Sequence, residues 1–338
     1  MPILPTGKVP PKILEKTVFP FLGAADSDVI HGPGIGRDAA LVRVERKVIV
    51  ATTDPITGAV QNIGAYVIHI CANDIATFGI RPRWFLATIL LPENAESHML
   101  EKIMVSMHSA AESLNVSIIG GHTEVTPELK RPIIIGFMLG VSDHNQYVAS
   151  TQAKSGNSII LTKGVAIEGT AILATEREKL LRERLGTELV TRAQQYVHKI
   201  SVVPEAIKAM ETGAVTAMHD PTEGGVANGL HELADASELG FIVDRSKLVI
   251  HEETTRICDL FDINPLNLIG SGAMLIAVEE KNAPKVIQIL KEEGISASII
   301  GRLVKDPTQR KIIESDGSMK SLVQPTKDAL WEALSKPL

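Results

Sequence analysis

The sequence has little of what several large protein classes require. Its 338 residues include only two cysteines, Cys71 and Cys258, which excludes a disulfide framework and metal centres built on three or four thiolates. Lysine and arginine are scattered along a chain whose formal net charge is −6, and they form no basic face that would bind nucleic acid. These absences favour a globular protein without a nucleic-acid partner.

Long hydrophobic runs and two familiar nucleotide motifs are also missing. No uninterrupted apolar segment approaches the length of a membrane span, and the first residues contain no apolar signal-peptide core, so we expect a cytoplasmic protein without membrane contact. There is no GxxxxGK[ST] loop, and Gly32, Gly34 and Gly36 follow a GxGxG spacing instead of GxGxxG. A nucleotide would have to be bound by another route.

Apolar residues are present in sufficient number for a large core. They make up 44% of the chain, with a mean hydropathy of +0.13, so we expect an α/β protein of two domains. The polar, turn-rich segment 143–156 predicts the boundary, which gives domains 1–150 and 151–338. The expected strands are 47–53, 84–91, 116–120, 133–140, 158–162, 273–279 and 297–303, with a hairpin over 311–321. The expected helices include 12–22, 63–78, 201–213, 226–236 and 283–293.

Four acidic turns in the first 125 residues are the most informative motifs. Each places a carboxylate at the end of an apolar segment, where a loop can present it to a ligand. Converging carboxylates repel each other unless a cation lies between them, and magnesium prefers a few carboxylates together with substrate phosphates. The pattern favours a nucleotide site, although any single turn could be an Asx-turn or a helix cap. The turns are Gly36 to Ala40, Thr52 to Pro55, Asn73 to Ala76 and Gly120 to Glu124.

The third of these turns lies inside an expected helix. Asn73 and Asp74 interrupt the apolar segment 63–78, and burying them costs free energy unless a partner satisfies them. A solvent-facing stripe is the alternative. We favour a functional role because Asp74 would lie within reach of Asp38 and Asp54 if their strands neighbour this helix.

The segment from His219 to Gly225 precedes a further helix. Gly224 and Gly225 would let bare backbone N–H groups approach an anion at the positive end of the helix dipole. The alternative is that Asp220 or Thr222 caps the helix without any ligand. A rival interpretation combines two histidines and two carboxylates in one metal site. Its residues would be His122, Glu124, His219 and Asp220.

In this order, these motifs resemble the superfamily of aminoimidazole ribonucleotide (AIR) synthase, the PurM-like proteins. The matching segments are 36–40, 53–54, 73–82, 120–124 and 220–225. Members include formylglycinamidine synthase, selenophosphate synthetase, thiamine monophosphate kinase and the hydrogenase maturation protein HypE. The chain most resembles HypE and the archaeal AIR synthase-related proteins. The resemblance covers about residues 7–302. It implies a two-domain α/β protein whose N-terminal mixed sheets form a barrel across a homodimer and whose C-terminal domain is an α/β sandwich.

The resemblance also implies roles for individual residues. Asp38, Asp74 and Asp220 would hold Mg²⁺ on the phosphates of ATP, and Asp54 would assist them in binding and catalysis. Lys8, after Gly7 in the N-terminal arm, would close over the phosphates. The other nucleotide contacts would be Asn73, Gly120, Gly121 and His122, with Glu124 as a catalytic substitute for the acidic residue that relatives carry at position 122. Thr222, Gly224 and Gly225 would bind a phosphate or the second substrate.

We therefore expect a magnesium-dependent, ATP-consuming enzyme, a kinase, ligase or ATP hydrolase, that activates a small metabolite. The alternative is a HypE-like maturation or scaffold protein that binds nucleotide and acts with other hydrogenase-maturation factors. A purine-biosynthetic ligase is a weaker alternative. HypE carries a C-terminal cysteine that accepts a carbamoyl group, whereas this sequence ends in Ser335 to Leu338. Glu223 stands where HypE-like proteins have arginine, which leaves the substrate open.

Overall fold

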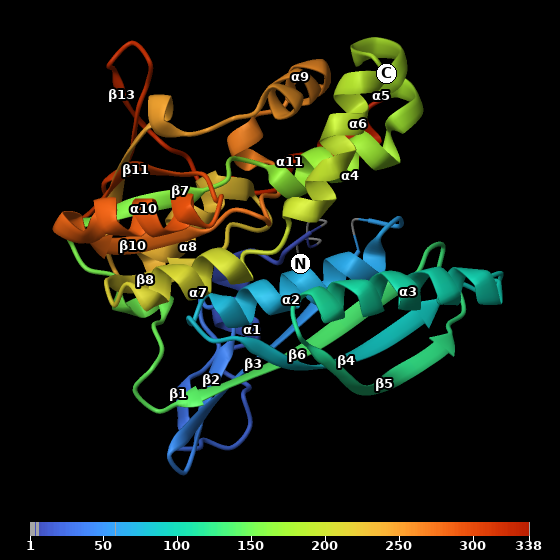
Figure 1. The fold of residues 1–338 in the computed structure, drawn as a ribbon, viewed down its shortest axis with the longest axis horizontal. Coiled ribbons are helices and arrows are strands. Elements are labelled where there is room, and N and C mark those ends of the chain that lie inside the picture. Colours follow the sequence, from blue (N-terminus) through green and yellow to red (C-terminus); the bar gives the residue numbers. More distant parts are fainter. Residues whose placement is uncertain (1–3, 5–6, 58, 338) are drawn as a thin grey trace.

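The computed structural model describes residues 4, 7–57 and 59–337, and these fold around two β-sheets with helices packed on both (Figure 1). The first sheet is built from the N-terminal half and has the strand order β1-β2-β3-β6-β4-β5. Its strands are β1 (Val29–His31), β2 (Ala40–Val44), β3 (Lys47–Ile56), β4 (Pro82–Leu91), β5 (Ser117–Val125) and β6 (Ile133–Asp143). Only the β4–β5 pair is parallel.

Two helices cover one face of this sheet. They are α2 (Ile63–Ala76) and α3 (Ser97–Ser113), and α1 (Pro11–Thr17) precedes the sheet. The α3 helix is amphipathic and buries Ile103, Met107, Ala110 and Ala111. By contrast, α2 is buried along nearly its whole length, because it lies between its own sheet and the C-terminal half (Figure 1). Polar residues of α2 are therefore in a position to contact both halves.

The second sheet belongs to the C-terminal half. Its order is β13-β12-β9-β11-β7-β10-β8. Its strands are β7 (Asn157–Thr162), β8 (Val215–His219), β9 (Gly240–Asp244), β10 (Leu275–Glu279), β11 (Ala297–Val304), β12 (Arg310–Ile313) and β13 (Met319–Ser321). Every residue of β7 is buried, as expected for an apolar central strand with both faces covered.

The helices of this half pack around the second sheet and above α2 (Figure 1). They are α4 (Ile167–Glu176), α5 (Glu178–Leu185), α6 (Thr187–Gln194), α7 (Val203–Glu211), α8 (Gly225–Ala236), α9 (Glu252–Phe261), α10 (Ala283–Glu292) and α11 (Ala329–Ser335). Short 3₁₀ segments lie at Ser150–Gln152, Gln195–Lys199, Arg245–Lys247, Pro265–Asn267 and Glu280–Asn282. Within the described residues, no helix combines the length and the apolar character that crossing a membrane needs.

Most elements expected from the sequence are confirmed, as is the α/β class. Three of the four acidic segments are not turns. Asn73 to Ala76 forms the end of α2, in agreement with the helical pattern of 63–78. Asp54 lies inside β3 and the segment 120–124 lies inside β5, because the pairing of β3 with β6 and of β5 with β4 continues past the points where turns were expected. The strands β1, β2, β8 and β9 were not expected, since each has five residues or fewer and no clear alternation of apolar and polar positions.

The two halves are joined by buried hydrogen bonds. The Asn73 amide donates to the carbonyl of Ile200 at 2.9 Å and accepts from the N–H of Val202 at 2.8 Å. Both groups of this side chain are thus used in linking α2 to the segment before α7. The nucleotide contact expected for Asn73 stays a prediction, since its amide nitrogen carries a second hydrogen that these contacts do not use.

Gly36 explains how the loop before β2 approaches the other half. Its φ is +68°, and a Cβ there would lie 2.2 Å from the carbonyl oxygen of Glu232 in α8, so only glycine fits. The hydroxyl of Ser150 donates to the Gly36 carbonyl at 2.6 Å, and the hydroxyl of Ser237 donates to the Ser150 carbonyl at 2.7 Å. This close contact places Asp38 against the C-terminal half.

We expect Asn73→Ala to weaken the junction between the halves. The variant leaves the Val202 N–H and the Ile200 carbonyl buried without these partners, and an orphaned group costs about 1–3 kcal/mol, so the free energy of unfolding should fall by about 2–4 kcal/mol. Urea denaturation followed by circular dichroism measures this. Asn94→Ala, at an exposed position, is the control, and equal stability of both variants would contradict the linking role.

Candidate functional site

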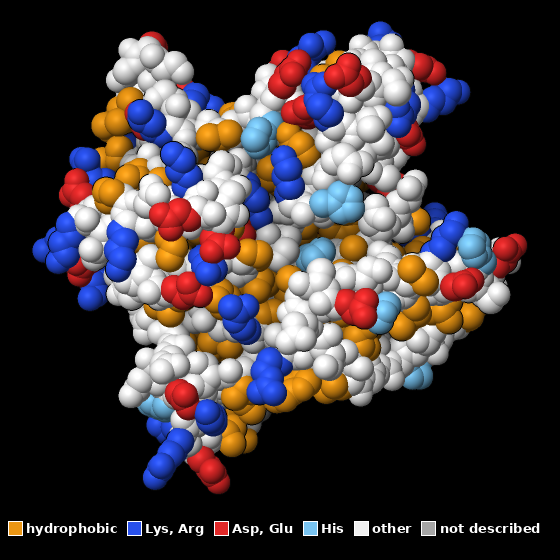
Figure 2. All heavy atoms as spheres, in the orientation of Figure 1, with side chains coloured by type: hydrophobic (Ala, Val, Ile, Leu, Met, Phe, Trp, Pro, Cys, Tyr) orange, Lys and Arg blue, Asp and Glu red, His pale blue; other side chains and the backbone are white. Residues whose placement is uncertain are grey.

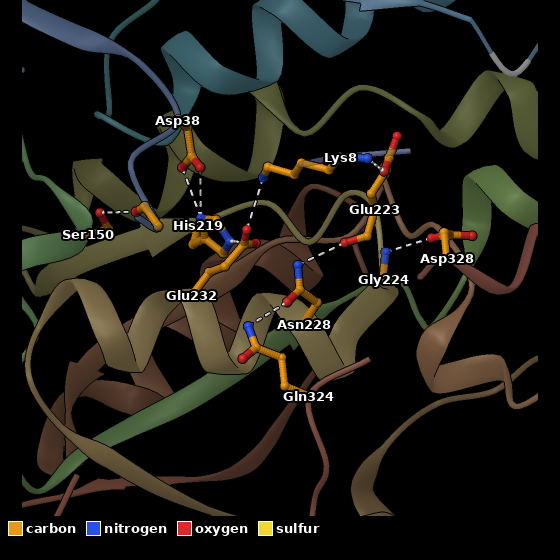
Figure 3. A network of polar contacts seen from close by, with 11 residues as sticks. Lys8, Asp38, Ser150, His219, Glu223, Gly224, Asn228, Glu232, Gln324 and Asp328 are labelled. Atoms are coloured by element: carbon orange, nitrogen blue, oxygen red, sulfur yellow. Dashed lines mark hydrogen bonds and ion pairs between the residues drawn. The ribbon is translucent and has the colours of Figure 1, made fainter. Parts of the chain in front are cut away.

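A chain of charged side chains crosses the junction between the halves (Figure 3). His219, at the end of β8, lies between two carboxylates: its Nδ1 is 2.9 Å from Asp38 Oδ1 and its Nε2 is 3.1 Å from Glu232 Oε2. Glu232 also accepts from the Nζ of Lys8 at 2.9 Å. The loop before β2, strand β8, helix α8 and the N-terminal arm are thus tied together by charge.

Burial and neighbouring charges have opposite effects on the pKa values of these linked side chains. Burial favours the neutral imidazole of His219, but the carboxylates of Asp38 and Glu232 outweigh it and raise the pKa of His219 well above its usual value. Burial also raises the pKa of Glu232, yet Lys8 and His219 lower it to about 2. The carboxylate of Glu232 raises the pKa of Lys8, whose side chain is 56% exposed. At neutral pH, His219 is therefore a cation that holds Asp38 in place.

Three further carboxyl groups gather beside Asp38. Asp54 comes from β3, Asp74 from α2 and Asp220 from the residue after β8, and the Thr52 hydroxyl donates to Asp74 Oδ2 at 2.5 Å. Burial raises the pKa of all three, and the mutual repulsion of Asp54, Asp74 and Asp220 adds to the rise for Asp74. Without a bound cation, it is therefore unfavourable for Asp54, Asp74 and Asp220 all to be ionised at once.

Asp220 is the clearest sign that this cluster serves a ligand. It is 1% exposed, and neither carboxyl oxygen has a hydrogen-bond partner among the described residues. A buried carboxylate without a partner is costly, whereas a hard cation with oxygen ligands would satisfy it. In the described part of the chain, no three His, Cys, Asp or Glu side chains are already arranged to hold a metal ion. Asp38, held by His219, and Asp74, held by Thr52, would have to turn towards one.

The N-terminus of α8 is built differently from the phosphate site expected there. The N–H of Gly224 donates to Asp328 Oδ2 at 2.6 Å, and the N–H of Gly225 donates to the Thr222 carbonyl at 3.0 Å. A carboxylate of this chain thus already occupies the position of the anion. The backbone of Glu223 is fixed by the Asn228 amide, which donates to its carbonyl at 2.9 Å (Figure 3).

Gly120, Gly121, His122 and Glu124 do not join this cluster. They lie on β5, the last strand of the first sheet, and β6 and β4 separate it from the strand of Asp54. His122 and Glu124 pair with each other at 3.1 Å, with side chains 65% and 48% exposed, whereas His219 and Asp220 are buried. The rival site of two histidines and two carboxylates is therefore wrong.

Several residues of the site were not expected from the sequence. Only one carried a signal: Glu232 is a charged residue on the buried side of the apolar helix 226–236. The others are ordinary polar residues whose roles follow from tertiary contacts alone. They are Thr52 and Asp328.

The fold and the site together define a class of two-domain α/β proteins. Each half has its own sheet, and an acidic cluster lies at the junction between the halves. Residues 36–142 match the model of the AIR synthase related protein, N-terminal domain, and residues 154–314 match that of the AIR synthase related protein, C-terminal domain. The chain therefore belongs to the AIR synthase related protein family, and the resemblance inferred from its motifs is confirmed.

The chain is similar to proteins named for hydrogenase formation and to HypE. A Methanocaldococcus jannaschii protein provisionally named a hydrogenase expression/formation protein is 30% identical over 277 residues, which is 80% of each chain. The carbamoyl dehydratase HypE of Rhizobium leguminosarum bv. viciae is 28% identical over 296 residues, 85% of this chain and 81% of its own.

Solved structures share the fold over almost the whole chain. HypE in a HypE–HypF complex superposes with a TM-score of 0.76 at 23% identity, covering 93% of this chain and 99% of that one. HypE in complex with ATP gives a TM-score of 0.73 at 20% identity, covering 97% and 98%. The two-sheet architecture is thus that of HypE.

The cluster predicts how stability depends on pH in metal-free protein. A carboxyl group whose pKa is raised by folding stabilises the fold below its unfolded pKa, near 4. This contribution is lost as the pH rises through the folded pKa, because the unfolded chain then releases the proton more readily. Because Asp220→Asn cannot ionise, the chelator-treated variant should melt at a higher temperature than the wild type at pH 8 and at a similar temperature at pH 4.

Asp259→Asn is the matched control, since Asp259 is exposed on α9. Its melting temperature should follow the wild type at every pH. If Asp220→Asn were no more stable than the wild type at pH 8, the buried carboxylate would not be repelled as described.

Proposed function

We propose that this protein binds ATP together with Mg²⁺ and uses it to activate a small metabolite, by phosphoryl transfer or hydrolysis. One observation carries the proposal: carboxylates from four elements in both halves converge, and the most buried one, Asp220, lacks any hydrogen-bond partner among the described residues. A nearby cation favours the ionised form of such a group. Magnesium held by a few carboxylates together with nucleotide phosphates would supply this cation.

In this proposal Asp38, Asp74 and Asp220 would hold Mg²⁺, and Asp54 would assist from β3. The metal, when bound, would supply neutralisation of the negative charge on the phosphates. The residues of the chain position the reactants: His219 fixes the orientation of Asp38, and Glu232 holds the ammonium group of Lys8 at the edge of the cluster. Positioning and charge neutralisation account for most of the catalysis of phosphoryl transfer.

The related structures support nucleotide binding by this protein, but they do not identify the reaction. HypE has been solved with ATP, and a second neighbour, AaThiL, with AMPPCP and TMP. A carbamoyl dehydratase activity like that of the HypE relatives is the second candidate, and the HypE–HypF complex makes a maturation factor a candidate partner. However, Cys71 and Cys258 are both buried, so neither thiol is available as an exposed carrier. This favours a separate small substrate.

The exposed face of β5 supports a homodimer through the N-terminal sheet. Ile119 and Val125 on β5 are 53% and 55% exposed, and Phe137 on β6 is 39% exposed. The outer edge of β5 pairs with no strand of the described chain, and an edge of this length is normally covered or paired. On the face of the molecule drawn in Figure 2, positive and negative side chains are interspersed.

Isothermal titration with ATP tests the proposal. We expect ATP to bind with Mg²⁺ and not in the presence of a chelator. Asp74→Asn, which removes one negative ligand, should weaken the binding by at least about 100-fold, or about 2.8 kcal/mol. Asp259→Asn is the control. Phosphorus NMR of the mixture then detects ADP and phosphate. Magnesium-independent binding, or an unaltered affinity in Asp74→Asn, would remove the cluster from nucleotide binding.

We expect substitutions of Lys8 to affect ATP cleavage and ATP binding differently. Its side chain is exposed over more than half its surface and sits on the N-terminal arm, so we expect it to act only when the arm closes over the reacting phosphate. Lys8→Ala should slow ATP cleavage more than it weakens ATP binding, while Lys8→Arg should retain part of the rate. Lys12→Ala, exposed on α1, is the control. Equal losses in binding and rate would assign Lys8 to ground-state binding.

A further inference from the structure

The N-terminal arm, residues 7–10 before α1, is held by the C-terminal half at two points. The backbone N–H of Lys8 donates to Glu223 Oε2 at 2.8 Å, and the Nζ of Lys8 donates to Glu232 Oε1 at 2.9 Å. Glu223 lies in the turn before α8, and Glu232 lies on α8 itself (Figure 3). The arm belongs to the N-terminal half of the sequence, yet both of these partners belong to the C-terminal half.

The two contacts of Lys8 constrain different parts of the residue. An ion pair of an exposed lysine is weak and allows many side-chain geometries, and the side chain of Lys8 is 56% exposed. The bond from its backbone N–H to a carboxylate is strengthened by the negative charge of the acceptor, and it fixes the main chain itself. The contact with Glu223 therefore limits where the ammonium group can reach, and it keeps this group beside Glu232.

The backbone of Glu223 is fixed on both sides. Its carbonyl accepts from the amide of Asn228 at 2.9 Å, and the Oδ1 of Asn228 accepts from the amide of Gln324 at 3.0 Å. The next N–H, that of Gly224, donates to Asp328 at 2.6 Å. Within the described residues, the bond from the arm is the single hydrogen bond that the Glu223 carboxylate makes. A rigid turn thus presents this carboxylate to the arm.

Gly7 fits the same contact from the side of the arm. Its φ is +99°, a conformation that residues with a side chain rarely adopt. A Cβ at this position would also lie 3.2 Å from Glu223 Oε2, the oxygen that accepts from Lys8. A side chain at position 7 would therefore strain the arm and press on its anchor.

We propose that Glu223 is a positioning residue, which docks the arm so that the ammonium group of Lys8 is held at the edge of the acidic cluster. This rests on the proposed function, in which Lys8 acts on the reacting phosphate of ATP. Removal of the Glu223 carboxylate would release the arm and leave the carboxylates of the cluster in place. A residue that acts through Lys8 in this way should affect ATP cleavage more than ATP affinity.

Limited trypsin digestion of the nucleotide-free protein tests the docking independently of ATP. Trypsin cleaves after lysine and requires the chain to be released locally, so a docked arm protects the bond between Lys8 and Val9. We expect Glu223→Ala to be cleaved there at least about 10-fold faster than the wild type, as measured by mass spectrometry of the whole chain. Glu223→Gln keeps an acceptor oxygen and should stay within about 3-fold of the wild type. Glu280→Ala, at an exposed position, is the control and should be cleaved like the wild type.

The rate of ATP cleavage and the affinity for ATP, both measured with Mg²⁺, separate positioning from binding. Glu223→Ala should slow cleavage at least about 10-fold and weaken ATP binding less than about 3-fold, whereas Glu223→Gln should keep most of the rate. Gly7→Ala should slow cleavage as Glu223→Ala does. The double variant should be no slower than either single variant, because both substitutions break the same contact.

Equal trypsin cleavage after Lys8 in the wild type and in Glu223→Ala would overturn the docking. Equal losses of rate and affinity in Glu223→Ala, or rate losses that add up in the double variant, would overturn the positioning role. A wild-type protein that cleaves no ATP would remove the proposed reaction, and the digestion would still decide whether Glu223 docks the arm.

Discussion

The ion pairs of His219 hold the junction of the two halves together. Its imidazolium lies between Asp38 of the N-terminal half and Glu232 of the C-terminal half. Because all three groups are nearly buried, the attraction is little screened by solvent, yet the burial of one group without the others would be costly. The glycine contact at Gly36 and the amide of Asn73 bring the halves into register. The ion pairs of His219 with Asp38 and Glu232 form only when the two halves keep this relative position.

The same junction carries an excess of negative charge. His219 and Lys8 balance Asp38 and Glu232, but Asp54, Asp74 and Asp220 have no cation of their own among the described contacts. The fold therefore gives up some stability to keep these groups adjacent, a pattern that is common where a site must bind a charged ligand.

The sequence was sufficient for the architecture and for the central acids. Long amphipathic or apolar segments such as 63–78 carry a strong periodic signal, and Asp38, Asp74 and Asp220 were recognisable from the order of their motifs. Pairing across the sheet could not be read from the sequence: nothing local shows that the segment 120–124 continues an edge strand, away from Asp54. Contacts over long separations were equally hidden. Lys8 and Glu232 are 224 positions apart, and Gly224 and Asp328 are 104 apart.

The N-terminal arm touches more than the charged chain. A side chain at Gly7 would lie 3.2 Å from the Nε1 of Trp331 and 3.2 Å from an oxygen of Glu223, so the backbone of the arm rests against helix α11 near the end of the sequence. A movement of the arm backbone at Gly7 would therefore change the surroundings of an indole ring. Since the chain contains two tryptophans and the other, Trp84, lies on β4 of the first sheet, the molecule carries its own optical reporter of arm position.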